Sequence, residues 1–429
     1  MEVLSRYIAD SLELGPLARE ILYAILIVAA AAIVFLIALI IAGLLTYLER
    51  RVAGRVQSRV GPNRVGPFGL LQWLADGLKL VMKEDLTPAD ADRVLFRLAP
   101  YVMMVGVFAA FASVPFGLLL IAADLNVGVL YILAITSLAT VGVLMAGWAS
   151  NNKWSMFGGI RAAAQIVSYE VPAALAILSV VLLSGTLSMQ GIIAMQGGWP
   201  WEWFIFHNPL TFVAFFIYFI AAVAEGNRIP FDLPEAESEL IAGYNTEYSG
   251  MRFAAFFLGE FANVYLMCAI ATTLFLGGWQ IPGIGVETQA DSVLLQIVGL
   301  AIFMAKASVG CFVVIWLRWT LPRLRVDQLM GLCYRYLVPI AFFCLAGNAV
   351  YLLVVPDGSY LGDIIHYLTA ALGGLVVLIF FWRVFYHIRS VGDKKDFNFF
   401  ARGERYRFDP SIQVRRYGRF RKQRGKETG

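Results

Sequence analysis

The segment between residues 225 and 248 holds six carboxylates and a single arginine, and it lies between two long apolar runs. The six acids are Glu225, Asp232, Glu235, Glu237, Glu239 and Glu247. A charged group at the edge of the hydrocarbon core of a membrane is unfavourable unless it faces water, a partner or a cavity. Six acids in this position therefore predict a proton or ion site.

Pro234 suits the first turn of a helix, and Glu235, Glu237 and Glu239 would then lie near the positive end of that helix. Glu235 and Glu239 would share one helix face, where two like charges favour retention of a proton by one of them. An ordinary acidic first turn is the simpler interpretation of these three residues. It does not explain the three further acids in the same segment.

Other ionisable residues lie within the apolar runs or at their ends. They are Glu49, Glu170, Glu225, Glu260 and Lys306. Buried carboxylates can hold a proton near neutral pH, so a series of such groups can relay protons. The alternative is a set of interhelical ion pairs, for example between Lys306 and one glutamate, that fixes the helix bundle. Several acids share one candidate base, which favours the relay.

The connection after the first apolar run combines arginines with two Gly-Pro pairs. Arg51, Arg55 and Arg59 are four residues apart, which predicts that they lie on one face of a helix continuing out of the membrane. The sequence GPNRVGP at residues 61–67 predicts a break in that helix. From residue 68 to residue 83, apolar and polar positions alternate with helical spacing, which predicts an amphipathic helix in the membrane interface.

This basic connection has two interpretations. Positively charged cytoplasmic loops and lipid contact would account for the arginines and for the amphipathic helix without any ligand. A Gly-Pro-rich loop between two helices at membrane depth could instead line an opening for an amphipathic ligand, with Asp76 on the polar face of the second helix. The pattern alone favours the first interpretation.

The composition is that of a polytopic membrane protein. Hydrophobic residues make up 59% of the 429 residues and charged residues 15%, below the roughly 25% that is typical of soluble domains. Apolar runs that can span the roughly 30 Å of hydrocarbon predict an all-α bundle of about nine transmembrane helices plus the interfacial helix. The nine runs lie at about residues 21–48, 98–123, 125–149, 161–184, 204–224, 252–277, 292–317, 336–356 and 364–382.

Lysine and arginine residues predict the orientation of these helices. Of the 34 such residues, 30 lie in the connections after the first, third, fifth and seventh helices and in the tail from Arg383. The positive-inside rule therefore predicts an outside amino terminus, with the acidic segment and the tail on the cytoplasmic side. We expect a bacterial inner membrane, with the mitochondrial inner membrane as the alternative. The acidic first 20 residues predict no cleavable signal peptide.

The chain lacks the sequence signatures of bound redox centres. Its four cysteines are scattered without a CxxC pair, and its three histidines are not placed as a haem pair. It has no P-loop, no dinucleotide-binding GxGxxG after a strand and no nucleophile elbow. We therefore expect that this chain binds no metal, iron–sulfur cluster or flavin and has no complete active site. Any electrons must arrive from another chain or a diffusible carrier.

Five motifs in one order carry a family resemblance. They lie at residues 48–72, 75–80, 159–170, 225–248 and 316–330. Over about residues 15–355 the sequence resembles the H-subunit family of respiratory complex I, the proton-pumping NADH:quinone oxidoreductase. The mitochondrial counterpart of that family is NADH dehydrogenase subunit 1. The resemblance implies an eight-helix core, quinone as substrate, and contacts with other membrane subunits, with peripheral-arm subunits and with lipid, but not with nucleic acid.

The matched motifs also assign residues to two sites. The resemblance implies that the quinone site is lined or supported by Glu49, Arg50, Arg51, Arg55, Arg59 and Asp76. It implies that proton coupling uses Arg161, Glu170, Glu225, Asp232, Glu235, Glu237, Glu239, Glu247, Glu260 and Lys306. The motif from Arg318 to Asp327 matches family positions of lesser expected importance. Quinone reduction takes up two protons, so it can shift the titration of linked carboxylates and become an electrostatic signal.

The chain extends beyond the eight-helix core, which we place at residues 1–355. An extra ninth helix is expected at residues 356–390 and a basic cytoplasmic tail at residues 391–429. Such a tail usually binds anionic lipid. Its aromatic residues favour contact with the peripheral arm of the complex as well.

Two other functions fit parts of the sequence. The membrane anchor of an energy-converting hydrogenase shares the ancestry of this family but has no quinone, and the intact GPNRVGP motif favours the quinone enzyme. A proton-coupled secondary transporter would also carry acids at mid-membrane. Against it, the chain shows no inverted repeat and no pair of broken helices in corresponding halves.

Overall fold

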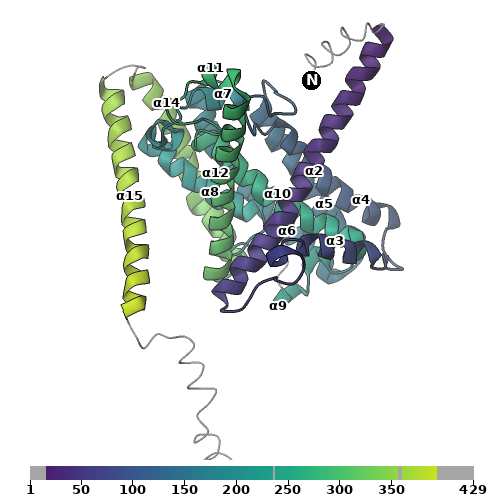
Figure 1. Cartoon of the computed structure of the whole chain (residues 1–429). Coiled ribbons are helices and arrows are strands. Elements are labelled where there is room, and N and C mark those ends of the chain that lie inside the picture. Colours follow the sequence, from purple (N-terminus) through teal and green to yellow (C-terminus); the bar gives the residue numbers. More distant parts are fainter. Residues whose placement is uncertain (1–15, 235–236, 356–359, 394–429) are drawn as a thin grey trace, which may run out of the picture. The chain divides into compact units, whose positions relative to one another are not determined.

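The computed structural model describes residues 16–234, 237–355 and 360–393. All regular elements in these ranges are helices (Figure 1), which confirms the predicted all-α class. The chain divides into two compact units, Met1–Thr369 and Ala370–Gly429. Apart from residues 391–393, the predicted basic tail lies outside the described residues.

Nine helices of 17 residues or more make up most of the described chain. They are α2 (Pro16–Val56), α4 (Arg93–Ala110), α5 (Gly128–Ala149), α6 (Lys153–Ser184), α8 (Pro209–Glu225), α10 (Gly250–Phe275), α12 (Val293–Thr320), α14 (Val338–Val354) and α15 (Tyr360–Asp393). Between them lie α3 (Gln72–Met82), α7 (Met189–Ala194), α9 (Glu237–Leu240), α11 (Val286–Asp291) and α13 (Val326–Leu332). The 3₁₀ turns are Pro67–Gly69, Phe111–Ser113, Pro200–Glu202, Phe204–Phe206 and Gly243–Asn245, and Cys333–Leu337 is a π-helical turn.

Eight spans within the described residues are long and apolar enough to cross a membrane. The fifth predicted span, 204–224, corresponds to α8, which has only 17 residues and is about 26 Å long. The first residues of the predicted span form a separate 3₁₀ turn, Phe204–Phe206. Helix α8 then begins at Pro209, and the Asn208 side chain accepts a hydrogen bond from the Thr211 N–H at 2.7 Å. The apolar run in the sequence therefore overstates the length of this helix.

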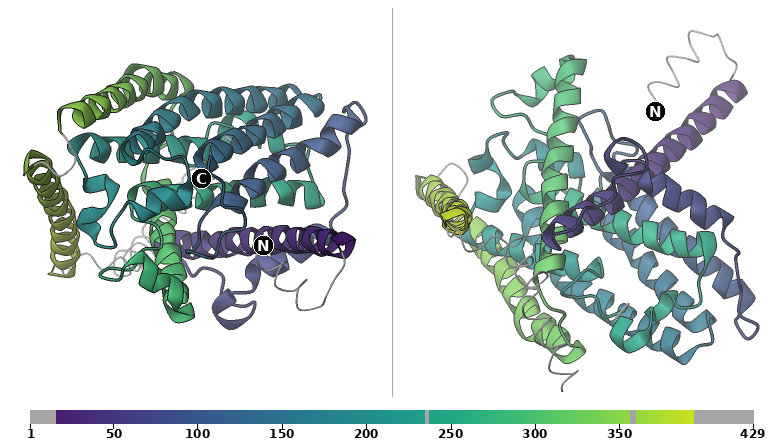
Figure 2. Two further views of the ribbon diagram at one scale, coloured as in Figure 1. Left: turned by 90° about the horizontal axis from the view of Figure 1, so that it is seen from above. Right: turned by 60° about the horizontal axis from the view of Figure 1, so that its bottom comes forward.

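Helix α10 lies at the centre of the bundle. In its most apolar span 72% of the residues are buried, against at most 50% in the other spans of the described chain. Small residues let its neighbour α4 approach α5 closely. A Cβ atom on Gly142 of α5 would lie 2.6 Å from the Met103 backbone nitrogen of α4, and one on Gly106 would lie 2.7 Å from the Ala139 nitrogen. Figure 2 shows α2, in purple, along one side of this bundle.

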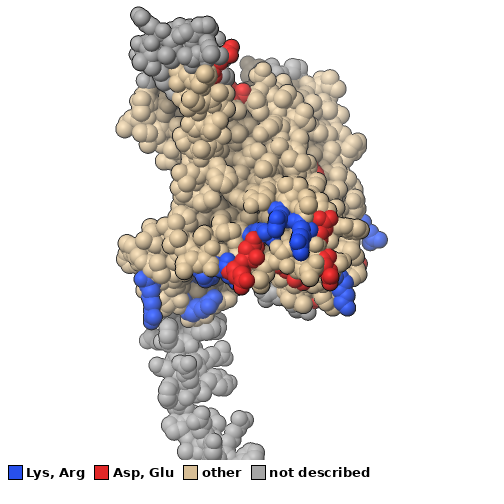
Figure 3. Space-filling model, turned by 90° about the vertical axis from the view of Figure 1, so that its right-hand side faces the viewer, with Lys and Arg blue, Asp and Glu red and all other residues tan. Residues whose placement is uncertain are grey.

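On one face of the molecule the charged side chains lie mainly at one level (Figure 3). On the face shown in Figure 3, most lysine, arginine, aspartate and glutamate side chains gather toward the lower end, and a broad uncharged surface lies above them. That uncharged surface is what lipid contact requires. Helix α3 lies at the charged level, near the end of α2 (Figure 1).

Candidate functional site

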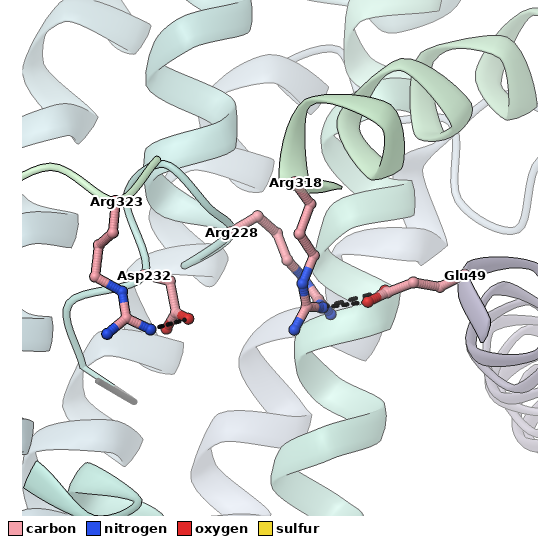
Figure 4. Close-up of polar contacts among 5 residues, drawn as sticks. All are labelled: Glu49, Arg228, Asp232, Arg318 and Arg323. Atoms are coloured by element: carbon pink, nitrogen blue, oxygen red, sulfur yellow. Dashed lines mark hydrogen bonds and ion pairs between the residues drawn. The ribbon is translucent and has the colours of Figure 1, made fainter. Parts of the chain in front are cut away.

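The last turns of α2 bring Glu49 into the interior, where two arginines from distant segments meet it (Figure 4). Arg318, in the last turn of α12, donates a hydrogen bond to Glu49 Oε1. Nη1 of Arg228, in the loop after α8, lies 3.4 Å from Glu49 Oε2. The side chains of Glu49 and Arg228 are only 10% and 7% exposed. Buried charges are tolerated only when they are paired. The two contacts of Glu49 therefore hold α2, α12 and the acidic segment together.

Arg228 also faces the acid in the middle of α10. Its guanidinium lies over the Phe261 ring, 4.0 Å from the ring centroid, and it interacts electrostatically with the buried carboxyl of Glu260. The Tyr244 hydroxyl donates a hydrogen bond to that same carboxyl. Nη2 of Arg228 has no hydrogen-bond partner among the described residues. Arg228 is thus paired with Glu49 and interacts electrostatically with Glu260.

A small pocket adjoins this charged group. It has apolar walls from α2, α10 and α12, and Glu49, Arg228 and Arg318 form its polar lining.

A second ion pair lies beside the first (Figure 4). Arg323 Nη2, in the connection after α12, lies 3.1 Å from Asp232 Oδ2. The other oxygen of Asp232 is buried and has no hydrogen-bond partner in the described part of the chain. Asp232 also interacts electrostatically with Glu260. Arg318 and Arg323, which meet the predicted acids Glu49 and Asp232, therefore both come from the motif between Arg318 and Asp327. A lesser role was predicted for that motif.

Helix α6 holds the acidic segment through an amide that the sequence analysis missed. The buried Gln165 Nε2 donates hydrogen bonds to the carbonyl oxygens of Ala224 and Phe231, both at 2.7 Å. The predicted acids Glu170, on α6, and Glu225, at the end of α8, interact electrostatically. Gln165 lies inside a membrane span, five residues before Glu170. A polar residue in that position was the signal that could have revealed it.

Two further acids of the segment, Glu239 and Glu247, pair with other residues. Glu239 Oε2 is 2.8 Å from Arg161 Nη1, and its side chain is 58% exposed. Glu247 accepts a hydrogen bond from Asn152 Nδ2 at 2.6 Å. The predicted helix beginning near Pro234 is present among the described residues only as the single turn α9. Glu235 and the side chain of Glu237 lie outside the described structure, so the predicted pairing of Glu235 with Glu239 stays a prediction.

The predicted interfacial helix is confirmed as α3, and its polar face turns toward α2. Asp76 accepts a hydrogen bond from Arg50 Nη1, and Lys79 Nζ lies 3.7 Å from its other oxygen. Arg51 donates hydrogen bonds to the carbonyl oxygens of Phe68, at 2.7 Å, and Pro62, at 3.2 Å, and so holds the Gly-Pro loop. The apolar side chains on the other face of α3 and just before it are exposed: Leu71, Leu74, Leu78 and Val81.

The predicted helix face through Arg51, Arg55 and Arg59 is wrong in its last member. Helix α2 ends at Val56, and Ser58 has a φ of 55°. The chain turns here because it doubles back on α2. A Cβ atom on Gly54 would lie only 2.9 Å from the backbone nitrogen of Gly61. Arg55 and Arg59 are exposed, whereas Arg50 pairs with Asp76 on α3 and Arg51 contacts the connection before α3.

Lys306 is not brought together with the acids. Its Nζ donates hydrogen bonds to the carbonyl oxygens of Leu276, at 2.6 Å, and Gly278, at 3.0 Å, just past the carboxyl end of α10. It also lies 4.4 Å from the centroid of the Trp203 ring. Within the described ranges no carboxylate lies within 4 Å of Lys306. The suggested ion pair between Lys306 and a glutamate is therefore absent from the described residues.

The four cysteines, Cys268, Cys311, Cys333 and Cys344, are all buried and free. Among the residues that the structure describes, no group of three or more histidine, cysteine, aspartate or glutamate side chains is arranged to hold a metal ion.

Comparison with known proteins gives one consistent family. The profile of the family described as NADH dehydrogenase matches residues 28–349. A protein of Anaeromyxobacter dehalogenans named as the H subunit of NADH-quinone oxidoreductase is 50% identical over 389 residues, which cover 87% of this chain and 94% of that protein. Proteins of the same name from Chlorobium luteolum and Rickettsia prowazekii are 49% and 48% identical, and they cover 77% and 76% of this chain. The aligned regions make up 90% and 93% of those two proteins.

Proposed function

The chain belongs to the NADH dehydrogenase family as an H subunit of NADH-quinone oxidoreductase, and from this premise we propose that it forms much of the quinone chamber and couples quinone reduction to proton translocation. The family and the apolar helices support the assignment of the chain as a membrane subunit of that oxidoreductase. The quinone chamber and the coupling to proton translocation are the proposal. Quinone is the substrate in this proposal, and the electrons come from partner subunits.

One observation carries the proposal. Arg228 pairs with Glu49, at the end of α2, and interacts electrostatically with Glu260, in the middle of α10. Glu49 directly precedes Arg50, whose ion pair with Asp76 holds α3. A single buried guanidinium therefore connects the proposed entrance of the quinone with the proposed proton-coupling acids.

The chemistry follows from charge balance. Reduction of a quinone to a quinol consumes two electrons and two protons, so an electron arriving before its proton leaves negative charge in the chamber. At 4 Å in surroundings with an effective dielectric constant near 20, two unit charges interact by about 4 kcal/mol. Negative charge near Arg228 and Arg318 would compete with Glu49 and Glu260 for these cations. Glu260 would then favour its protonated form, and the acids linked to it would respond in turn.

The acids Glu170, Glu225 and Asp232 would carry that response onward, since each is buried or partly buried and interacts with another charged group. Arg161, Glu239 and Glu247 lie at the rim of this group, and Glu235 and Glu237 belong to the same segment. On the entrance side we assign Glu49, Arg50, Arg51 and Asp76 to the chamber wall. Arg55 and Arg59, which are exposed, face partner subunits or lipid headgroups.

We place the chain in a bacterial inner membrane, with its amino terminus outside and the acidic segment on the cytoplasmic side. The positive-inside rule and the bacterial sources of the relatives support this placement. Residues 1–355 would form the core, residues 356–390 an extra membrane helix, and residues 391–429 a tail that binds lipid or the peripheral arm. Other membrane subunits and peripheral-arm subunits complete the chamber.

The hydrogenase anchor and the secondary transporter are the other candidate functions. The relatives named above are all NADH-quinone oxidoreductase subunits, which supports the quinone enzyme over both. The contacts of Arg50 with Asp76 on α3 and of Arg51 with the loop before it further favour a ligand entrance over a simple charged loop.

Arg228→Gln tests the proposal, because it removes the charge that links the two sites and keeps much of the side-chain shape. We expect loss of NADH-driven quinone reduction and of proton pumping in the assembled complex, with NADH oxidation by a hydrophilic artificial acceptor intact. Arg335→Gln, at an exposed arginine, is the matched control and should leave all three activities unchanged. Wild-type quinone reduction and pumping in an Arg228→Gln complex would overturn the proposed coupling.

A further inference from the structure

The connection between α3 and α4, residues 83–92, crosses the first turn of α10 and is fastened there by two side chains. We call these ten residues the strap. Ser249 Oγ accepts a hydrogen bond from the Leu86 N–H and donates one to the Glu84 carbonyl, both at 3.1 Å. Arg252 Nη2 lies 2.8 Å from Asp85 Oδ2, and its Nη1 donates a hydrogen bond to Thr87 Oγ1 at 3.1 Å.

The fit of the strap against α10 depends on close backbone approach. Gly250, the first residue of α10, has a φ of +57°, and a Cβ atom there would lie 3.2 Å from the Lys83 carbonyl oxygen. Four bonds from two side chains on one helical turn, together with this approach, fix the strap more firmly than an ordinary surface loop. The strap begins directly after α3, so a displacement of α3 acts on the start of α10.

A small separate core lies under the strap and leads to Glu260. Arg252 lies over the Phe96 ring of α4, and Phe96 stacks on Tyr248 with centroids 4.1 Å apart and an interplanar angle of 5°. Tyr248 and Tyr244 both pack against the Phe256 ring edge to face, at 4.9 and 5.4 Å. These aromatic residues belong to one buried cluster, distinct from the main core of the bundle. Because Tyr244 donates its hydroxyl hydrogen to Glu260, that cluster positions the donor.

Burial is consistent with a rigid cluster. Burial raises the pKa of the Tyr248 phenol, and the neighbouring Arg252 opposes that shift to a smaller extent. The Tyr248 hydroxyl therefore stays protonated, and it donates to the Phe96 carbonyl at 3.2 Å. Close-packed aromatic clusters shift as units because they have few alternative packings.

We propose that Ser249 and Arg252 are positioning residues: they latch the strap to α10, so that the position of α3 and the protonation of Glu260 are linked through the aromatic cluster. This inference rests on the proposed function, which places the quinone entrance at α3 and proton coupling at Glu260. Linkage is reciprocal, so quinone binding and the state of Glu260 influence each other by the same factor.

A double-mutant cycle on the purified, assembled complex tests the latch. The dissociation constant for decylubiquinone is measured at equilibrium, without NADH, in complexes with and without Glu260→Gln. With the latch intact, we expect this substitution to change the dissociation constant by about fivefold or more. In the Ser249→Ala background the same substitution should change it by a clearly smaller factor, because only the link through Arg228 then remains. An undiminished factor in that background would overturn the latch.

Further variants keep the test decisive. Asp85→Asn removes the ion pair at a side chain that is 44% exposed, so it serves if Ser249→Ala disturbs assembly, and the same loss of linkage is expected. Arg97→Gln, at an exposed arginine on α4, should leave the factor unchanged. Asp76→Asn separates this inference from its premise. If Asp76→Asn leaves the dissociation constant unaltered, the proposed entrance at α3 is wrong. If Asp76→Asn weakens binding but Ser249→Ala does not change the linkage factor, only the latch is wrong.

Discussion

Two intramembrane charges, Glu260 on α10 and Lys306 on α12, have opposite surroundings along α10. Toward its amino end, the carboxyl of Glu260 is surrounded by groups that can change charge or position: Arg228, Asp232, Arg318 and the Tyr244 hydroxyl. Just past its carboxyl end, Lys306 donates its hydrogen bonds, within the described residues, to the backbone carbonyls of Leu276 and Gly278, and it lies against Trp203.

This difference separates a coupling site from a structural cap. Backbone carbonyls do not titrate, and the negative end of a helix favours a cation permanently. The glycines after α10 complete a tight helix end, since Gly277 and Gly278 have φ values of 70° and 50°. A charge in a membrane helix thus favours proton coupling when a titratable group lies near it, as Asp232 does for Glu260. Lys306 was grouped with the acids from sequence, and its contacts favour the role of a cap.

Glu260→Gln should produce the largest effect and tests the coupling side of the comparison. The amide keeps the shape of the carboxyl but neither titrates nor attracts Arg228, so we expect quinone-dependent proton pumping to be abolished. NADH oxidation by a hydrophilic acceptor, measured on the same preparation, should persist. A wild-type ratio of protons pumped to electrons transferred would show that Glu260 is a structural partner of Arg228.

The fold and the candidate site were predictable from the sequence to different degrees. Apolar runs located the helices, because the membrane imposes length and composition on each span. The charge pattern of the acidic segment identified Glu225 and Asp232, and the ionisable residues within or at the ends of the apolar runs identified Glu49, Glu170 and Glu260. Their partners were not predictable, since Glu49 meets Arg318 across 269 positions of the chain, and no local spacing encodes such a contact. The end of α2 at Val56 was missed for the same reason, because the close packing of Gly54 on Gly61 is a property of the folded loop.

Lys306→Met should come next, as a loss of stability. Removing two charge-assisted hydrogen bonds is expected to destabilise the end of α10 by about 3 kcal/mol, visible as a lower melting temperature of the purified complex. Lys79→Met, at a lysine whose side chain is 69% exposed, is the control and should leave the melting temperature unchanged. In the complex that remains folded, the number of protons pumped per electron should equal that of the wild type. If fewer protons were pumped per electron at unchanged stability, Lys306 would belong to the proton-coupling residues.

Glu170→Gln and Glu239→Gln sharpen the comparison within the acidic group itself. Glu170 lies inside α6 and interacts with Glu225, so we expect a severe loss of quinone-coupled pumping. The Glu239 side chain is 58% exposed, and its pair with Arg161 resembles surface ion pairs that contribute about 0–1 kcal/mol. We therefore expect only a small loss for Glu239→Gln. Pumping assays in vesicles that contain each variant distinguish the two, and equal losses would mean that exposure does not rank these acids.

The smallest effect is expected at the exposed arginines after Glu49. Arg55 lies in the last turn of α2 and has no ion pair within the described ranges, whereas Asp76 is held by Arg50. Asp76→Leu should raise the apparent KM for quinone several-fold, because it releases α3 and leaves Arg50 without its partner. Arg55→Ala should change that KM by less than about twofold, as is usual for a surface substitution within about 0.5 kcal/mol. Steady-state titration with quinone measures both. A larger effect at Arg55 than at Asp76 would place the quinone entrance on the exposed face of α2 and away from the Arg50–Asp76 contact.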